Sequence, residues 1–220
     1  MLAKNQLTLT KDSLALLSIY GSLSLQNGEY FQQNPRLLFR NKINCRNQLK
    51  AFWNIENKES MIRHMDWVLQ TGYREEYSIL HKRFSMMTGP ACQTYIDNLV
   101  GDSEARYQAG IVYQYLYSVP VAGIAAYDYA FALYAAYAGV AAGYLTENEK
   151  NHYASLFVRK IQQEINGPRD YVLGYMIGIQ YVQVGADPEY IAKQKIAFTK
   201  MITSSKSLLY TVSFWKKSHS

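Results

Sequence analysis

Asp128 is the residue whose surroundings most suggest chemistry, because it is the single charge in an otherwise apolar run over 121–145. A carboxylate among apolar side chains has a perturbed pKa and can act as an acid or a base. Buried carboxylates are more often satisfied by a tyrosine hydroxyl or an arginine within a helical bundle. We favour this structural role, and a site acid is the alternative.

A second candidate is the Glu149-x-x-His152 pair, which could ligate a metal ion. Di-iron bundles need two such pairs and two further glutamates pointing inward, and the sequence holds no second pair. Thr146 and Glu149 instead match a capping box that starts a helix. The sequence also lacks G-x-S-x-G, P-loop, H-E-x-x-H and C-x-x-C motifs. We therefore expect no catalytic residue, no metal and no cofactor.

Basic residues gather in a segment over 36–50 that contains no acidic residue; they are Arg36, Arg40, Lys42, Arg46 and Lys50. Arg46 and Lys50 are one helical turn apart and would share a face. Such a cluster is most often a solvated surface. It could also bind an acidic protein or a nucleic acid, although no nucleic-acid-binding signature accompanies it.

The apolar run over 121–145 is the element around which we expect the chain to fold. Its residues are mainly alanine and tyrosine, and a carboxylate such as Asp128 is costly in lipid. The run therefore predicts a buried helix in a protein with no membrane span. Ala135, Gly139 and Gly143 recur every four residues and would let a neighbouring helix approach closely.

Capping and breaking residues divide the rest of the chain into helices. We predict them over 11–26, 43–53, 58–71, 73–87, 91–100, 103–118, 147–165, 169–184 and 188–204, with a loop over 29–40. Thr10, Asn57 and Thr146 are the predicted N-caps. The tail over 205–220 is expected to pack back, with frayed last residues. The predicted fold is all-α: a single domain over 1–220, with eight to nine helices around 121–145.

Composition sets the expected class of protein. The 220 residues are 49% hydrophobic and include 20 tyrosines, enough for a sizeable core with polar edges. Cys45 and Cys92 lie far apart and predict free thiols in a reducing compartment. The N-terminus lacks the signal-peptide pattern, so we expect a cytoplasmic location. The net charge of +6 favours either simple solubility or an acidic partner.

Three blocks of the sequence resemble a bacterial family of unknown function, the YbeU/YbeR-like family. The blocks are LALLSIYGSLSLQNGEY, FWNIENKESMIRHMDWVLQTGYREEY and AAYDYAFALYAAYAGVAAGYLTENE. The resemblance covers roughly 14–215. It depends most on Trp53-Asn54-Ile55, Trp67, Leu69 and Gly72-Tyr73-Arg74, on Tyr127-Asp128 in place of the family's Trp-Asp pair, and on Gly143-Tyr144-Leu145 with Glu149. It implies a helical fold and no particular activity.

The sequence also departs from that family. Tyr73 replaces a usual histidine, and Phe131 and Ala136 stand where arginines often follow the Trp-Asp pair. If the family uses those arginines in a polar pocket, this chain has lost part of it. Asp128 would then pair with Arg74 in a structural salt bridge.

We weigh three functions. The first is a non-catalytic immunity or antitoxin protein, whose basic surface would meet a toxin domain with an acidic surface. The second is an enzyme in which Asp128, Arg74 and Tyr73 converge for acid–base work. The third is a nucleic-acid binder that uses the segment over 36–50. We rank them in this order.

Overall fold

The computed structural model describes residues 2–24, 35–183 and 188–215. Within these ranges every regular element is a helix, which confirms the predicted all-α class. The elements are α1 (Leu2–Ser24), η2 (Pro35–Phe39), α2 (Lys42–Trp53), α3 (Lys58–Gln70), α4 (Gly72–Ser85), α5 (Gly89–Asp97), α6 (Ser103–Gln114), α7 (Ala125–Ala142), α8 (Glu147–Glu164), α9 (Pro168–Val182), α10 (Pro188–Thr203) and η3 (Leu208–Thr211). None of the helices in these ranges is long and apolar enough to cross a bilayer.

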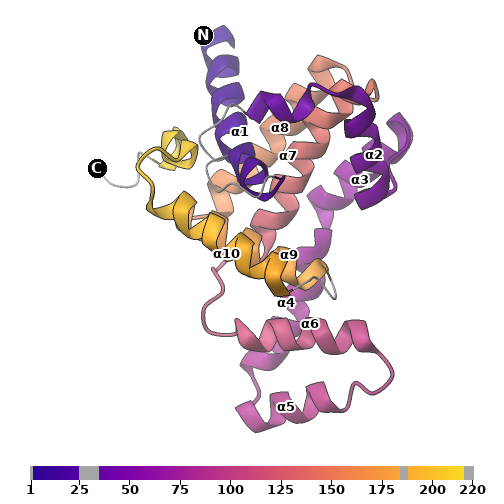
Figure 1. Cartoon of the computed structure of the whole chain (residues 1–220), viewed down its shortest axis with the longest axis vertical. Helices are drawn as coiled ribbons and strands as arrows, with labels where there is room; N and C mark the ends of the chain where they lie inside the picture. Colours follow the sequence, from indigo (N-terminus) through magenta and orange to yellow (C-terminus); the bar gives the residue numbers. More distant parts are fainter. Residues whose placement is uncertain (1, 25–34, 184–187, 216–220) are drawn as a thin grey trace.

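Helix α7 is the centre of the bundle (Figure 1). It contacts α1, α2, α3, α4, α8 and α9, and nearly all of its residues are buried. Alanine side chains make α7 thin, so its neighbours can approach closely, and its tyrosines fill the remaining space. The predicted buried central helix is therefore confirmed.

The helix is shorter than the apolar run over 121–145. Before it, Gly123 adopts a left-handed conformation with φ +59° and donates its N–H to Pro120 O at 2.8 Å. This turn leaves Val121 95% exposed. After it, Gly143 with φ +82° forms the C-cap, a conformation that glycine adopts without strain. Apolar composition alone did not reveal these two turns.

Small residues allow α9 to lie against α7. A Cβ at Gly178 would lie 2.3 Å from Tyr127 Cβ, and one at Gly174 would lie 2.8 Å from Gly123 O. Gly139 makes a similar approach to Met61 of α3. Gly143 is exposed, so it serves to end the helix and not to extend the stripe of small residues.

The N-terminal helix differs from the prediction. Helix α1 begins at Leu2, so Thr10 lies inside it and is not an N-cap. Residues 2–10 contain no glycine or proline that would stop the helix. The predicted end near 26 lies outside the described residues, as does 29–34 of the predicted loop. The rest of that loop includes the short 3-10 helix η2.

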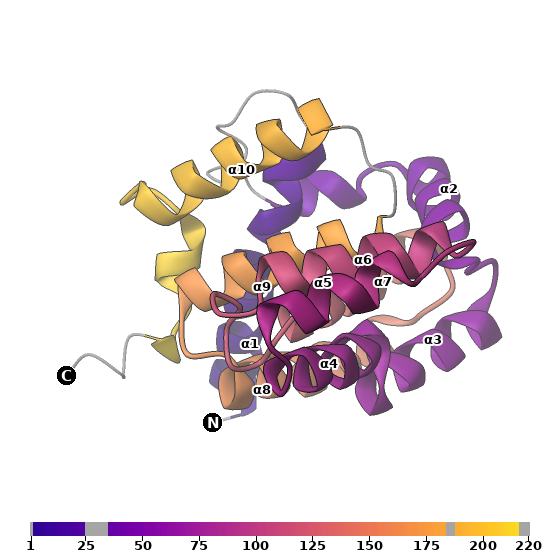
Figure 2. The same cartoon turned by 90° about the horizontal axis from the view of Figure 1, so that it is seen from below.

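The apolar core has two parts. The larger surrounds α7, and the smaller joins α4, α5 and α6 to the end of α9 through Tyr77, Phe84, Val112, Ile177 and neighbouring residues. In Figure 1, α5 and α6 lie at the end of the molecule opposite the N-terminus. Figure 2 places α10 on one side of the molecule and α3 and α4 on the opposite side.

The chain after α10 lies against the body up to Trp215. Leu209 and Val212 are fully buried. The Ser213 N–H donates to Asp12 Oδ1 of α1 at 2.8 Å, and Trp215 Nε1 donates to Ile165 O at 3.3 Å. The residues expected to fray, 216–220, lie outside the described part of the chain.

Candidate functional site

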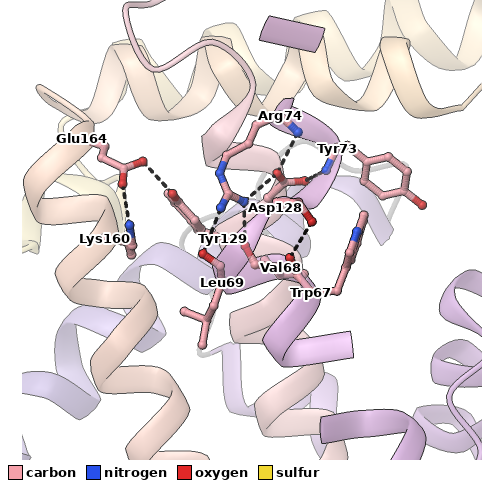
Figure 3. A network of polar contacts seen from close by, with 10 residues as sticks. Trp67, Val68, Leu69, Tyr73, Arg74, Asp128, Tyr129, Lys160 and Glu164 are labelled. Carbon is pink, nitrogen blue, oxygen red and sulfur yellow. Dashed lines mark hydrogen bonds and ion pairs between the residues drawn. The ribbon is translucent and has the colours of Figure 1, made fainter. Parts of the chain in front are cut away.

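Asp128 lies in the first turn of α7, and its carboxylate points to the start of α4 (Figure 3). It accepts hydrogen bonds from the backbone N–H groups of Tyr73 at 3.1 Å and Arg74 at 3.0 Å. The N-cap residue of α4, Thr71, makes no side-chain capping bond. Asp128 therefore caps α4 from a different helix, because the first N–H groups of a helix lack internal partners.

The close approach depends on Gly72. This residue has φ +60°, and a Cβ there would lie 2.2 Å from Asp128 Oδ2. Any side chain would displace the carboxylate from the N–H groups that it binds. One short segment therefore supplies both the turn, at Gly72, and the backbone donors, at Tyr73 and Arg74.

Arg74 binds both Asp128 and the C-terminal end of α3. Its Nη1 lies 3.1 Å from Asp128 Oδ2 and also donates to Val68 O at 2.7 Å, while Nη2 donates to Leu69 O at 3.2 Å. Those carbonyls belong to the last turn of α3, where the backbone has no internal donor. The Asp128–Arg74 pair thus links the end of α3 to the starts of α4 and α7; we call this arrangement the three-helix joint.

The network continues from the joint to α8 through Tyr129. The Arg74 guanidinium lies over the Tyr129 ring, 5.0 Å from its centroid. The Tyr129 hydroxyl donates to Glu164 Oε2 at 2.6 Å, and Lys160 lies 3.2 Å from the other carboxylate oxygen. Four helices are therefore tied together by one continuous set of polar contacts (Figure 3).

Burial raises the pKa of Asp128 to about 6, against the lowering effect of Arg74 and the two backbone donors. A raised pKa is the property expected of an acid–base residue, but the Asp128 side chain is 0% exposed. Both carboxylate oxygens are already engaged by the protein. The geometry explains the carboxylate completely as a capping and pairing group.

Tyr73 does not bring its phenol to the pair. It contributes its backbone N–H, and its ring points away from Asp128 in Figure 3. The ring packs edge-on against Trp67 with centroids 5.0 Å apart. A depression of about 360 Å³ beside the joint is lined by Arg74 and His81 among others, and Asp128 is not one of the described residues lining it. The three acid–base candidates therefore do not face one open cavity.

The basic segment is divided between different surfaces. Arg36 lines a depression near Glu147 and Lys150, and Arg40 lines a separate, larger cavity. Lys42, Arg46 and Lys50 lie four residues apart along α2 and are exposed; we call them the α2 basic row.

Two members of the α2 basic row have identified partners. Arg46 Nε donates to Ala142 O at 3.0 Å and its guanidinium lies 5.6 Å from the Tyr144 ring centroid. It therefore satisfies the C-terminal end of α7, where positive charge is favourable. Lys50 lies 2.6 Å from Glu56 in an exposed pair. Sequence spacing placed these cations on one face but did not show that one of them caps the central helix.

Glu149 is used as a cap. It accepts the Thr146 N–H at 2.8 Å and pairs with Lys58 at 2.6 Å, and Lys58 and Thr146 lower its pKa to about 2. His152 is exposed. Cys45 and Cys92 are free and buried in α2 and α5.

Sequence reasoning missed an aromatic-lined cavity. It has a volume of about 570 Å³ and lies between α1, η2, α2, α7, α9 and α10. Aromatic residues line it, including Tyr20, Trp53, Phe131, Tyr134 and Tyr175. They are widely separated in the sequence, and the high tyrosine content was the only signal of such a surface.

The structure is that of an all-α protein in which the buried carboxylate of Asp128 holds helix ends together. The chain belongs to the family described as "Protein of unknown function (DUF1266)", whose model matches residues 48–218. Arg74 and Asp128 fall inside the matched range, while Arg36, Arg40, Lys42 and Arg46 precede it. No curated protein and no solved structure gave a significant match.

Proposed function

We propose that the protein is a non-catalytic binding protein of the immunity or antitoxin type, which neutralises a bacterial toxin in the cytoplasm by direct contact. The observation that carries this proposal is the α2 basic row. Lys42, Arg46 and Lys50 lie along one exposed helix face, and the net charge of the chain is +6. Such a face would complement a toxin domain with an acidic surface.

The fixed position of Arg46 within the row supports a binding role. Arg46 is held by the end of α7 and by the Tyr144 ring, so its charge is fixed before a partner arrives. A fixed charge loses little conformational entropy on binding. Complementary charge also accelerates encounter and suppresses wrong partners.

The three-helix joint supports the non-catalytic part of the proposal. Asp128 and Arg74 were the strongest acid–base candidates, and their polar atoms bind the ends of α3 and α4. Within the DUF1266 family, we propose that the chain groups with the YbeU/YbeR-like members.

The test is protection of growing cells. The product of each neighbouring open reading frame is expressed in bacteria with and without this protein, and growth is measured. We expect one product to arrest growth and this protein to restore it. Restoration should be lost with Lys42→Glu/Lys50→Glu and kept with Lys195→Glu/Lys200→Glu, which makes the same charge change on exposed positions of α10. Failure to protect against any of these products would contradict the proposal.

A further inference from the structure

The cavity of about 570 Å³ has the size of a small-molecule site. The cavity is open to solvent on one side, where Arg40, Asn44 and Phe52 are exposed, so a ligand could enter it. We propose that it binds a small planar aromatic molecule that carries one acidic group. This activity is separate from toxin binding by the α2 basic row.

The apolar walls of the cavity are aromatic rings held by one another. Trp53 and Phe131 meet edge-on with centroids 4.7 Å apart, and Tyr20 stacks on Tyr134 at 4.7 Å. Tyr175 lies nearly parallel to Phe131. These contacts restrict the rings to fixed orientations. Tyr134 and Tyr175 are buried beneath the others, so a planar ligand would meet the partly exposed rings of Tyr20, Trp53 and Phe131. Offset-stacked and edge-on contacts are the favoured geometry between aromatic rings.

The polar side of the cavity carries positive charge. Arg40 is the one charged residue among the described residues that line it, and the others that are polar are uncharged amides and phenols. Gln48 accepts a hydrogen bond from the Tyr134 hydroxyl, which fixes its amide so that its NH₂ group can donate. A guanidinium among the residues lining an aromatic cavity suits a carboxylate, sulfonate or phosphate on a ring system.

The arrangement of α2 separates this cavity from the proposed toxin-binding face. Asn44, Gln48 and Phe52 are four residues apart and line the cavity. The α2 basic row occupies positions offset by two residues, which lie well around the helix from that line. Arg40 therefore belongs to the cavity by position, although sequence analysis grouped it with the basic segment.

The proposal can be tested with two fluorescent probes of nearly the same ring structure. Anilinonaphthalene sulfonate carries an acidic group, and phenylnaphthylamine does not. We expect saturable binding of one anilinonaphthalene sulfonate per chain and a rise in the melting temperature of the protein, because the ligand binds the folded state. No saturable binding, or a lowered melting temperature, would overturn the proposal.

Two variants locate the probe. Asn44→Trp should fill the cavity and weaken both probes by about tenfold or more, while Asn47→Trp, an exposed position three residues along α2, should leave both unchanged. Arg40→Gln, at an exposed residue, should weaken the sulfonate by about tenfold and spare phenylnaphthylamine. Unchanged binding to Asn44→Trp, equal loss in Asn47→Trp, or an Arg40→Gln effect that is the same for both probes would each overturn it.

Discussion

At the scale of residues, one carboxylate shows how a perturbed group can be structural. Asp128 is buried and its pKa is raised to about 6, features that would attract attention in any search for catalytic residues. Its surroundings consist of two backbone N–H groups and a guanidinium that itself binds two helix-end carbonyls. The raised pKa follows from burial, and the burial follows from the meeting of three helix ends.

Asp128→Asn tests this role directly. The variant keeps the size of the side chain but places an amide NH₂ group where the carboxylate faces donors, and it leaves Arg74 without a counter-charge. We expect the free energy of unfolding to fall by about 3 kcal/mol, measured by urea denaturation followed by circular dichroism. Glu59→Gln is the matched control, because it removes an exposed pair with Arg63 and should cost less than about 1 kcal/mol. Equal stabilities for the two variants would contradict the capping role.

His64 gives a prediction about pH. It lies between Trp53 and Trp67, its Nε2 is buried with no hydrogen-bond partner among the described residues, and burial lowers its pKa to about 4. The unfolded chain binds a proton to this residue near pH 6.5, whereas the folded chain does so only near pH 4. Stability from neutral His64 is therefore complete above pH 6.5 and is lost as the pH falls towards 4.

The measurement compares the wild type with His64→Phe at pH 7 and pH 4. Acidification should lower the unfolding free energy of the wild type by about 1–3 kcal/mol more than that of the variant. The contribution of Asp128 to the pH dependence has the opposite sign, because its raised pKa costs stability as the pH rises through 4–6. Asp128 is present in both proteins, so its contribution cancels in the comparison. Parallel loss of stability in the two proteins would show that His64 does not titrate as described.

At the scale of elements, local signals were reliable where a few neighbouring residues decide the structure. The capping box of Thr146 and Glu149 and the N-cap at Asn57 are confirmed. The predicted N-cap at Thr10 was wrong, because a potential capping residue inside an uninterrupted helical segment does not start a helix. The two ends of α7 within the apolar run were not predicted, because they depend on the left-handed conformations of Gly123 and Gly143. Composition does not reveal which glycines adopt that conformation.

Helix α9 can approach α7 only because Gly178 has no side chain. Gly178→Ala should therefore destabilise the fold by about 2–3 kcal/mol, since the added methyl group would overlap Tyr127 Cβ. Gly110→Ala is the control, because a Cβ at that helical position meets nothing within 4 Å, and it should stabilise by up to about 1 kcal/mol. Thermal unfolding of the two variants measures both effects. A Gly178→Ala protein as stable as Gly110→Ala would contradict the close packing.

At the scale of the whole molecule, the buried central helix could be predicted because its hydropathy is visible along the sequence. The Asp128–Arg74 salt bridge was also expected from the sequence, and the two side chains lie 3.1 Å apart. The backbone contacts that make this pair a three-helix joint could not be predicted, and neither could the aromatic cavity, because each joins residues that are far apart in the chain. The three-helix joint combines Arg74 with Asp128, and the cavity combines residues from Tyr20 to Tyr190. The basic segment was found by its local charge, but its division between a cavity, a helix cap and an exposed row depends on the folded structure.

The most direct test of function by contact is the dissociation constant between this protein and the toxin identified by growth protection, measured by calorimetry at two salt concentrations. We expect Lys42→Glu/Lys50→Glu to weaken binding by about tenfold or more, added salt to weaken the wild-type complex, and Lys195→Glu/Lys200→Glu to bind as the wild type does. Equal dissociation constants for all three proteins would show that the α2 basic row does not bind the toxin.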